Sequence, residues 1–162
     1  MKATVLYYSK TGNTRQMAEV IVAGMMSVDD VEAKAFPIEE IDESWAKESQ
    51  CVVLGTPTYM ASLAGTVKSW LEGSCMSYGF TGKLGGAFAT ADYLHGGAEL
   101  GIQSILDRML VLGMMTYSGG GAYGTPVIHL GPVALKDHLE ESKETFHKYG
   151  QRMATKAKDL FK

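Results

Sequence analysis

Short apolar runs that end at polar turns alternate with segments of helical periodicity along this chain of 162 residues. The runs predict five buried strands, at residues 2–8, 32–38, 51–55, 84–90 and 114–117. Between and after these runs, apolar side chains at helical spacing predict helices that begin near residues 13, 63, 102 and 136. Strands that are apolar on both faces and alternate with helices form parallel sheets with both faces covered, and the chain is too short for an eight-unit barrel. We therefore expect an α/β fold with an open, doubly wound, five-stranded parallel sheet.

The length fits a single domain, residues 1–162. A net charge of −3 is too close to neutrality to capture nucleic acid or an anionic membrane surface by charge. The sequence shows no signal-peptide pattern and no segment suited to membrane insertion, which predicts a soluble, cytoplasmic protein. The two cysteines, Cys51 and Cys75, match no zinc motif, and a disulfide between them stays an open alternative. We expect the methionines to fill the core.

Polar loops follow three of the predicted strands, and these loops are where an open α/β sheet binds its ligands. Residues 9–14 follow the first strand, residues 56–60 the third and residues 90–97 the fourth. The first loop brings three hydroxyls, a carboxamide and backbone N–H groups to a helix N-terminus, which is suited to binding a phosphate. Ordinary helix capping is the alternative. In the other two loops, Tyr59 and Tyr93 are placed to stack on a flat conjugated ligand, or to cover the core of the protein itself.

Other motifs exclude several kinds of site. Gly119, Gly121 and Gly124 match a dinucleotide-binding spacing, but Thr125-Pro126 follows and no helix is predicted to open there. A Walker lysine is missing, since Lys83 precedes Leu84 and not a hydroxyl residue. The four histidines give no metal cluster, because His138 and His147 are predicted on opposite faces of the last helix. His95 and His129 lie in loops and are candidate substrate contacts or ordinary loop histidines.

Taken together, the loops resemble those of flavodoxin-like proteins. Residues 9–14 are similar to the hydroxyl-rich loop with which that family binds the 5′-phosphate of FMN. The order of Thr56-Pro57-Thr58, Gly65, Trp70-Leu71, Gly82-Lys83-Leu84 and Gly96-Gly97-Ala98-Glu99 resembles tryptophan-repressor-binding-type NAD(P)H:quinone reductases. The turn at residues 120–124 is similar to their Gly-Gly-x-x-Tyr-Gly turn. The resemblance implies a flavodoxin-like sheet with strand order 2-1-3-4-5.

The resemblance also implies which residues hold the cofactor. The phosphate would be bound by the first loop, that is, by Ser9, Lys10, Thr11, Gly12, Asn13 and Thr14. The isoalloxazine would be bound by the two other loops, that is, by Thr56, Pro57, Thr58, Tyr59, Met60, Ala61, Thr90, Ala91, Asp92, Tyr93, Gly96 and Gly97. Tyr59-Met60 stand where those reductases usually carry Arg-Phe, so their substrate contact does not transfer.

For function, the resemblance implies an NAD(P)H-dependent oxidoreductase that passes electrons through FMN to a quinone or a similar small acceptor. FMN would carry the chemistry, so no catalytic side chain and no metal are expected, and Tyr59, His95 and His129 are candidate substrate contacts. The alternative is a one-electron carrier between redox proteins. The modest net charge favours the enzyme, because dedicated carriers tend to be strongly acidic. A non-redox interaction module and a homo-oligomer stay open.

Overall fold

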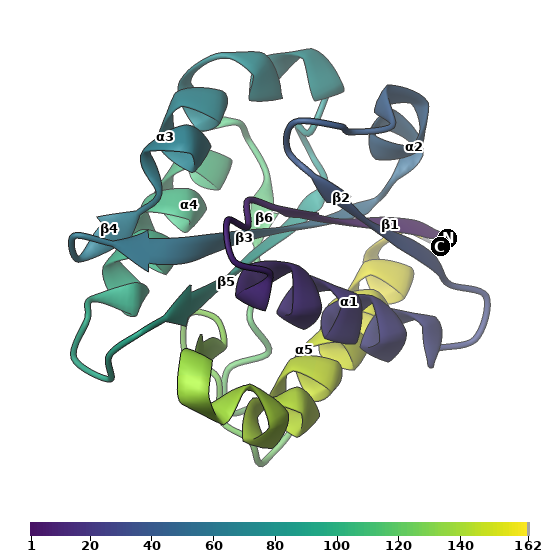
Figure 1. The fold of residues 1–162 in the computed structure, drawn as a ribbon. Helices are drawn as coiled ribbons and strands as arrows, with labels where there is room; N and C mark the ends of the chain where they lie inside the picture. The colour runs from purple at the N-terminus through teal and green to yellow at the C-terminus, as the bar shows by residue number, and fades with distance from the viewer. Residues whose placement is uncertain (162) are drawn as a thin grey trace.

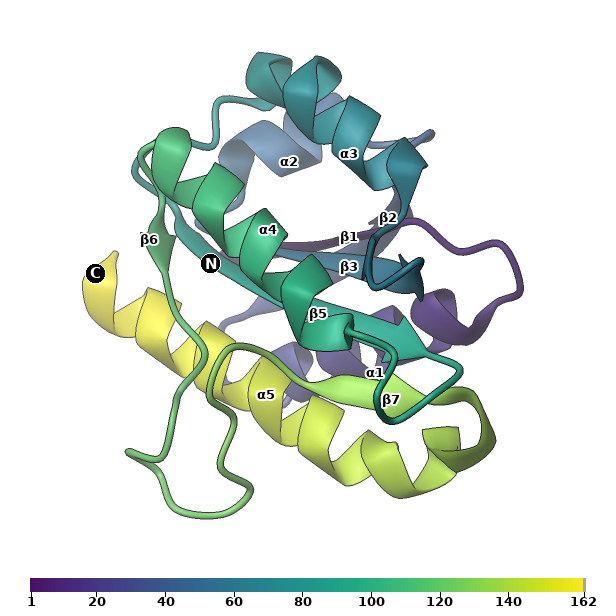
Figure 2. The same cartoon turned by 90° about the vertical axis from the view of Figure 1, so that its left-hand side faces the viewer.

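A twisted sheet runs through the middle of the protein and carries helices on both faces (Figures 1 and 2). The computed structural model describes residues 1–161, so the last residue of the predicted domain lies outside the described part. The strands are β1 (Lys2–Tyr7), β2 (Glu32–Pro37), β3 (Cys51–Tyr59), β4 (Ser62–Leu63), β5 (Leu84–Ala91), β6 (Met115–Thr116) and β7 (Val133–Leu135). The helices are α1 (Asn13–Met26), α2 (Glu43–Glu48), α3 (Gly65–Glu72), α4 (Ala98–Val111) and α5 (Leu139–Leu160), with 3-10 turns at η1 (Ser74–Tyr78) and η2 (Lys136–His138).

The strand order confirms the predicted flavodoxin-like topology. The path is β2-β1-β3-β5-β6, and all of these neighbours pair in parallel. In the numbering of the predicted strands this is 2-1-3-4-5. The fifth position is split, however, because β6 pairs with the start of β5 and β7 pairs with its end. Residues 117–132 form a long excursion between the two halves.

Two apolar layers cover the sheet. In β1, Val5 packs with α1 and α5 on one face, while the next residue, Leu6, packs with α3 and α4 on the other. Both faces of β1 are therefore buried, as its continuous apolar run predicts. The expected core role of the methionines is confirmed for Met17, Met25, Met109, Met114 and Met153, which are buried, and is wrong for Met26, Met60, Met76 and Met115, which are exposed.

The two cysteines are buried and free, so the disulfide alternative does not apply. No helix within residues 1–161 combines the length and the apolar character that crossing a membrane requires.

Several elements differ from those predicted. The acidic connection contains α2, whose N-cap Asp42 accepts a hydrogen bond from the Trp45 backbone N–H at 3.0 Å. The Trp45 indole N–H donates to the carbonyl of Ala3, which fixes this short helix against β1. A six-residue helix held by one cap and one buried tryptophan has too little periodicity to be seen in the sequence.

The chain near the last helix also differs from the prediction. His138 lies in η2, and α5 begins one residue later, so His138 and His147 are not two faces of one helix. As predicted, no helix begins directly after the glycine motif, because residues 125–132 carry no helical element.

Candidate functional site

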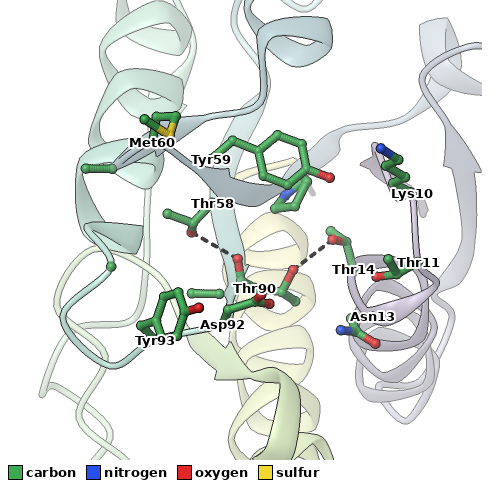
Figure 3. Close-up of a pocket in the computed structure, with 14 residues that line it drawn as sticks. Lys10, Thr11, Asn13, Thr14, Thr58, Tyr59, Met60, Thr90, Asp92 and Tyr93 are labelled. Atoms are coloured by element: carbon green, nitrogen blue, oxygen red, sulfur yellow. Dashed lines mark hydrogen bonds between the residues drawn. The ribbon is translucent and has the colours of Figure 1, made fainter.

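A cavity of about 510 Å³ opens at the carboxyl ends of β1, β3 and β5, where the three predicted ligand loops meet. All fourteen residues that line it belong to the predicted cofactor set, and Figure 3 shows ten of them labelled. Four predicted residues do not line the cavity, namely Ser9, Gly12, Thr56 and Gly97. The volume falls within the range of roughly 300–1,000 Å³ that is typical of small-molecule sites.

The first loop presents the N-terminus of α1 to the cavity. Gly12 is the N-cap of α1 and has φ of 99°, a left-handed conformation that glycine adopts without strain. Gly12 has no side chain with which to cap the helix, and the first turn carries no acidic residue. Ser9 shapes the loop from inside, because its hydroxyl accepts from the backbone N–H groups of Gly12 and Arg15 at 3.1 and 3.2 Å. The result is a set of helix N–H groups and a partial positive charge at the cavity.

The second loop is a tight hairpin and not the open loop that the sequence suggests. Tyr59 at the end of β3 pairs with Ser62 of β4, which leaves Met60 and Ala61 as the turn. Both turn residues have positive φ, 50° and 58°, although neither is glycine. Met60 is 98% exposed at the tip. Turns of this geometry favour glycine or asparagine, so the sequence gives little sign of the hairpin.

The third loop packs tightly against this hairpin. Gly97 has φ of 84°, and a Cβ placed on it would lie 2.8 Å from the Cβ of Ala61. Tyr93 is 73% exposed, and the neighbouring Asp92 carboxylate lies 3.5 Å from the Lys136 ammonium group. Gly97 therefore contributes by letting the two loops approach, while Tyr93 and Asp92 face the cavity (Figure 3).

Threonine hydroxyls join the three loops beneath the cavity. The Oγ1 atoms of Thr14 and Thr90 lie 2.8 Å apart and share a hydrogen bond, and the Thr58 hydroxyl donates to the carbonyl of Thr90 at 2.9 Å (Figure 3). Thr14 and Thr90 are buried. Thr56 does not line the cavity; its hydroxyl oxygen accepts from the backbone N–H of Ala64 at 3.0 Å and so ties β3 to the start of α3. Sequence reasoning picked these residues as ligand contacts and missed their contacts with one another.

The cavity is polar at one end and aromatic at the other. Lys10, Thr11 and Asn13 lie on the α1 side, while Tyr59 and Tyr93 come from the two loops opposite (Figure 3). Burial raises the pKa of the Tyr59 phenol above its ordinary value, so the neutral form persists to higher pH. Such an arrangement suits an elongated molecule with an anion at one end and a flat ring at the other.

The two loop histidines are not part of this cavity. His95 is exposed in the third loop without lining the cavity, and His129 lies in the 117–132 segment, where it borders a separate hollow. Within residues 1–161, no three His, Cys, Asp or Glu side chains are grouped as metal ligands.

Comparison with known proteins assigns the family. The model of the flavodoxin family matches residues 5–78, which include the first two loops of the site. A flavodoxin from Clostridium saccharobutylicum is 37% identical over 161 residues, covering 99% of this chain and 100% of that protein. The chain belongs to the flavodoxin family. This membership and the flavodoxin-like fold confirm the broader part of the sequence prediction.

Two further similarities bear on the type of flavodoxin-family protein. An NAD(P)H dehydrogenase (quinone) from Syntrophobacter fumaroxidans is 27% identical over 204 residues, covering 99% of this chain and 98% of that protein. The crystal structure of a flavodoxin, WrbA-like protein from Agrobacterium tumefaciens superposes with a TM-score of 0.78 at 22% identity, covering 98% of each chain. The second likeness is one of fold. The reductase subtype thus stays a prediction, and the flavodoxin relative is the more similar in sequence.

Proposed function

We propose that this protein is an FMN-binding electron carrier that moves single electrons between redox proteins. The observation that carries the proposal is the cavity at the ends of β1, β3 and β5, which joins the N-terminus of α1 to two exposed tyrosines. The 37% identical flavodoxin supports the carrier over the reductase that the loops suggest. We treat residues 1–162 as one flavodoxin-like domain.

The residues at the α1 end fit the phosphate of FMN. The first turn of α1 offers backbone N–H donors besides the Arg15 N–H, which the Ser9 hydroxyl accepts. Thr11, Asn13 and Lys10 add a hydroxyl, a carboxamide and an ammonium group at the cavity. No carboxylate lies in the first turn of the helix to repel an anion. Backbone N–H groups and the helix dipole bind phosphate without a metal or a Walker lysine, so the missing lysine motif does not count against the site.

The opposite end fits the isoalloxazine. Tyr59 and Tyr93 would hold the ring by stacking from two different loops, and Pro57 and Ala61, which also line the cavity, would add apolar contacts. When bound, FMN supplies reversible transfer of one or two electrons. The chain itself supplies binding, orientation and a contact surface for the partner.

The rim of the cavity favours a protein partner over a small hydride donor. Met60, Tyr93 and Leu94 are each more than 70% exposed and form an apolar edge beside the cavity. A nicotinamide has to lie against an open face of the flavin, whereas tyrosines from two loops would occupy ring faces and leave an edge for electron transfer. The small net charge does not exclude a carrier, because an apolar rim can dock a partner without long-range steering.

An anaerobic reduction experiment separates the two functions. The FMN-loaded protein is mixed with excess NADH or NADPH, and its flavin absorbance is followed; dithionite serves as the control reductant. In a carrier, the absorbance of the oxidised flavin stays unchanged with either nucleotide, and dithionite reduces the flavin in two separable one-electron steps. Bleaching by a nicotinamide nucleotide alone, followed by reoxidation with a quinone, would establish the reductase and overturn the carrier assignment.

A further inference from the structure

A buried arginine stands apart from the flavin site. Arg152, on α5, is 8% exposed and reaches into the 117–132 segment. Its Nη1 donates to the carbonyl of Pro126 at 2.6 Å, and its Nη2 donates to the carbonyl of Gly124 at 3.2 Å. The guanidinium also lies 6.0 Å from the ring centre of Tyr123. These contacts use two of the five N–H donors of the guanidinium group.

The carboxylates nearest to Arg152 along its own helix are distant from it. The segment 117–132 contains no Asp or Glu, and those of α5, namely Glu140, Glu141, Glu144 and Asp159, lie at least seven positions away (152 to 159). Among the ion pairs formed within residues 1–161, none includes Arg152. A buried charge without a counter-ion is costly, and carbonyl dipoles compensate it only in part.

A cavity of about 210 Å³ adjoins this guanidinium. Besides Arg152, it is lined by Tyr123 and Thr125 from the 117–132 segment and by Lys148, Gln151 and Thr155 from α5. The lining thus combines two cations, an amide and three hydroxyls, all able to donate hydrogen bonds to an anion. None of these residues lines the flavin cavity, and Figure 2 shows the 117–132 loop at the other end of the sheet from the β5–α4 loop.

We propose that this second cavity binds a small oxyanion, that is, the phosphate or carboxylate group of a small molecule. Arg152 is the central ligand. The carbonyls of Gly124 and Pro126 fix the plane of its guanidinium group and leave other N–H donors of that group for the anion. Lys148 is exposed on α5 one turn before Arg152 and supplies a second positive charge at the entrance of this cavity. The anion would give Arg152 the ion-pair partner that it lacks within residues 1–161, and it would link α5 to the 117–132 segment.

The test uses the FMN-loaded protein, so that the phosphate-binding loop of α1 is already filled. Inorganic phosphate and malonate are titrated separately at constant ionic strength, with potassium chloride as the compensating salt, and backbone amide NMR shifts are recorded. We expect saturable shifts confined to Thr125, Gln151 and Thr155. Saturation with phosphate but not malonate would assign a phosphate source, the reverse a carboxylate source, and saturation with both a general oxyanion site.

Two variants and a matched control make the test specific. Lys148→Ala is expected to weaken binding roughly threefold, as fits the loss of one exposed charge contact. Arg152→Lys keeps the positive charge but loses the planar guanidinium and its several N–H donors, and is expected to weaken anion binding about tenfold. Lys143→Ala removes a lysine of the same helix that pairs with Glu140 outside the cavity, so it should leave binding unchanged.

Three outcomes would overturn the proposal. The first is the absence of saturable shifts with either anion. The second is equal affinity for the anion in the native protein and in the Lys148→Ala variant. That variant keeps Arg152 and its contacts, so its folding is not in question. The third is loss of stability in Arg152→Lys with no anion binding by the native protein, which would make Arg152 an anchor of the loop and nothing more.

Discussion

At the scale of single residues, three threonines decide how the flavin site is held together. Thr90 is the centre, because its hydroxyl bonds Thr14 of the phosphate loop while its carbonyl accepts from Thr58 of the hairpin strand. The Thr14–Thr90 pair holds two hydroxyl protons, and one of them suffices for the bond between the two oxygens. The second proton is thus available to an acceptor in the cavity that both residues line. Thr90 therefore joins the three loops and, in the proposed FMN site, would also offer a hydroxyl proton to the ligand.

The first prediction concerns Thr90→Val, which keeps the side-chain shape and removes the hydroxyl. We expect FMN to bind about fivefold more weakly, because one buried hydrogen bond is worth roughly 1 kcal/mol and Thr14 is left without its partner. The measurement is the dissociation constant from quenching of flavin fluorescence. Thr66→Val, at an exposed position of α3, is the control and should bind FMN normally. Unchanged affinity in Thr90→Val would show that the network does not position the site.

At the scale of elements, glycines set the distance between α1 and α5. A Cβ placed on Gly150 would lie 2.2 Å from the carbonyl oxygen of Ile21, and one placed on Gly24 would lie 2.1 Å from the carbonyl oxygen of His147. Both contacts are with backbone atoms, which cannot rotate away as side chains do. The two helices cover one face of the sheet, so their separation also fixes where the N-terminus of α1 meets the flavin cavity.

The second prediction follows for Gly150→Ala. Alanine gains about 1 kcal/mol in helix propensity over glycine, yet we expect a net loss of roughly 2 kcal/mol in unfolding free energy, because the helices have to move apart. Urea unfolding measures it. Gly65→Ala is the matched helical control, since a Cβ there meets no atom within 4 Å, and it should unfold at an equal or higher urea concentration. A stabilised Gly150→Ala protein would contradict the close packing.

The elements also show what the sequence can and cannot predict. Strands that are buried on both faces, and the loops at their carboxyl ends, were predicted because continuous apolar runs and hydroxyl-rich turns are local signals. The hairpin at Met60-Ala61 was not, because residues other than glycine hold positive φ there. β7 has three residues after a glycine-rich segment, too few to show alternation. The Thr14–Thr90 contact spans 76 positions, so no local pattern encodes it.

At the scale of the whole molecule, burial links stability to pH. Burial raises the pKa of the Cys51 thiol from 9.0 to about 12 and also raises the pKa of the Tyr149 phenol, whose hydroxyl donates to the carbonyl of Ala87 at 3.3 Å. Both groups stay protonated in the folded chain at pH values where they ionise in the unfolded chain. The unfolded state then binds fewer protons, so the free energy of unfolding falls as pH rises.

The third prediction gives the range and the size of this effect. Stability from the neutral Cys51 thiol is fully present below pH 9 and is lost as pH rises from 9 toward 12, by about 1.4 kcal/mol per pH unit. Urea unfolding between pH 7 and pH 11 measures the slope. Cys51→Ala should show a shallower decline above pH 9 than the native protein. Identical slopes in the two proteins would mean that Cys51 does not remain a buried thiol.

The most direct test of the FMN site is a titration of the flavin-free protein with FMN and with riboflavin, followed by flavin fluorescence. We predict one FMN per chain, with riboflavin binding roughly a hundredfold more weakly because it lacks the phosphate that the α1 loop bonds. Replacing Thr11 by Val together with Gly12 by Ala should abolish FMN binding while the circular dichroism spectrum of the sheet and helices is kept. Equal affinity for FMN and riboflavin, or normal FMN binding by that double variant, would contradict the phosphate site at the N-terminus of α1.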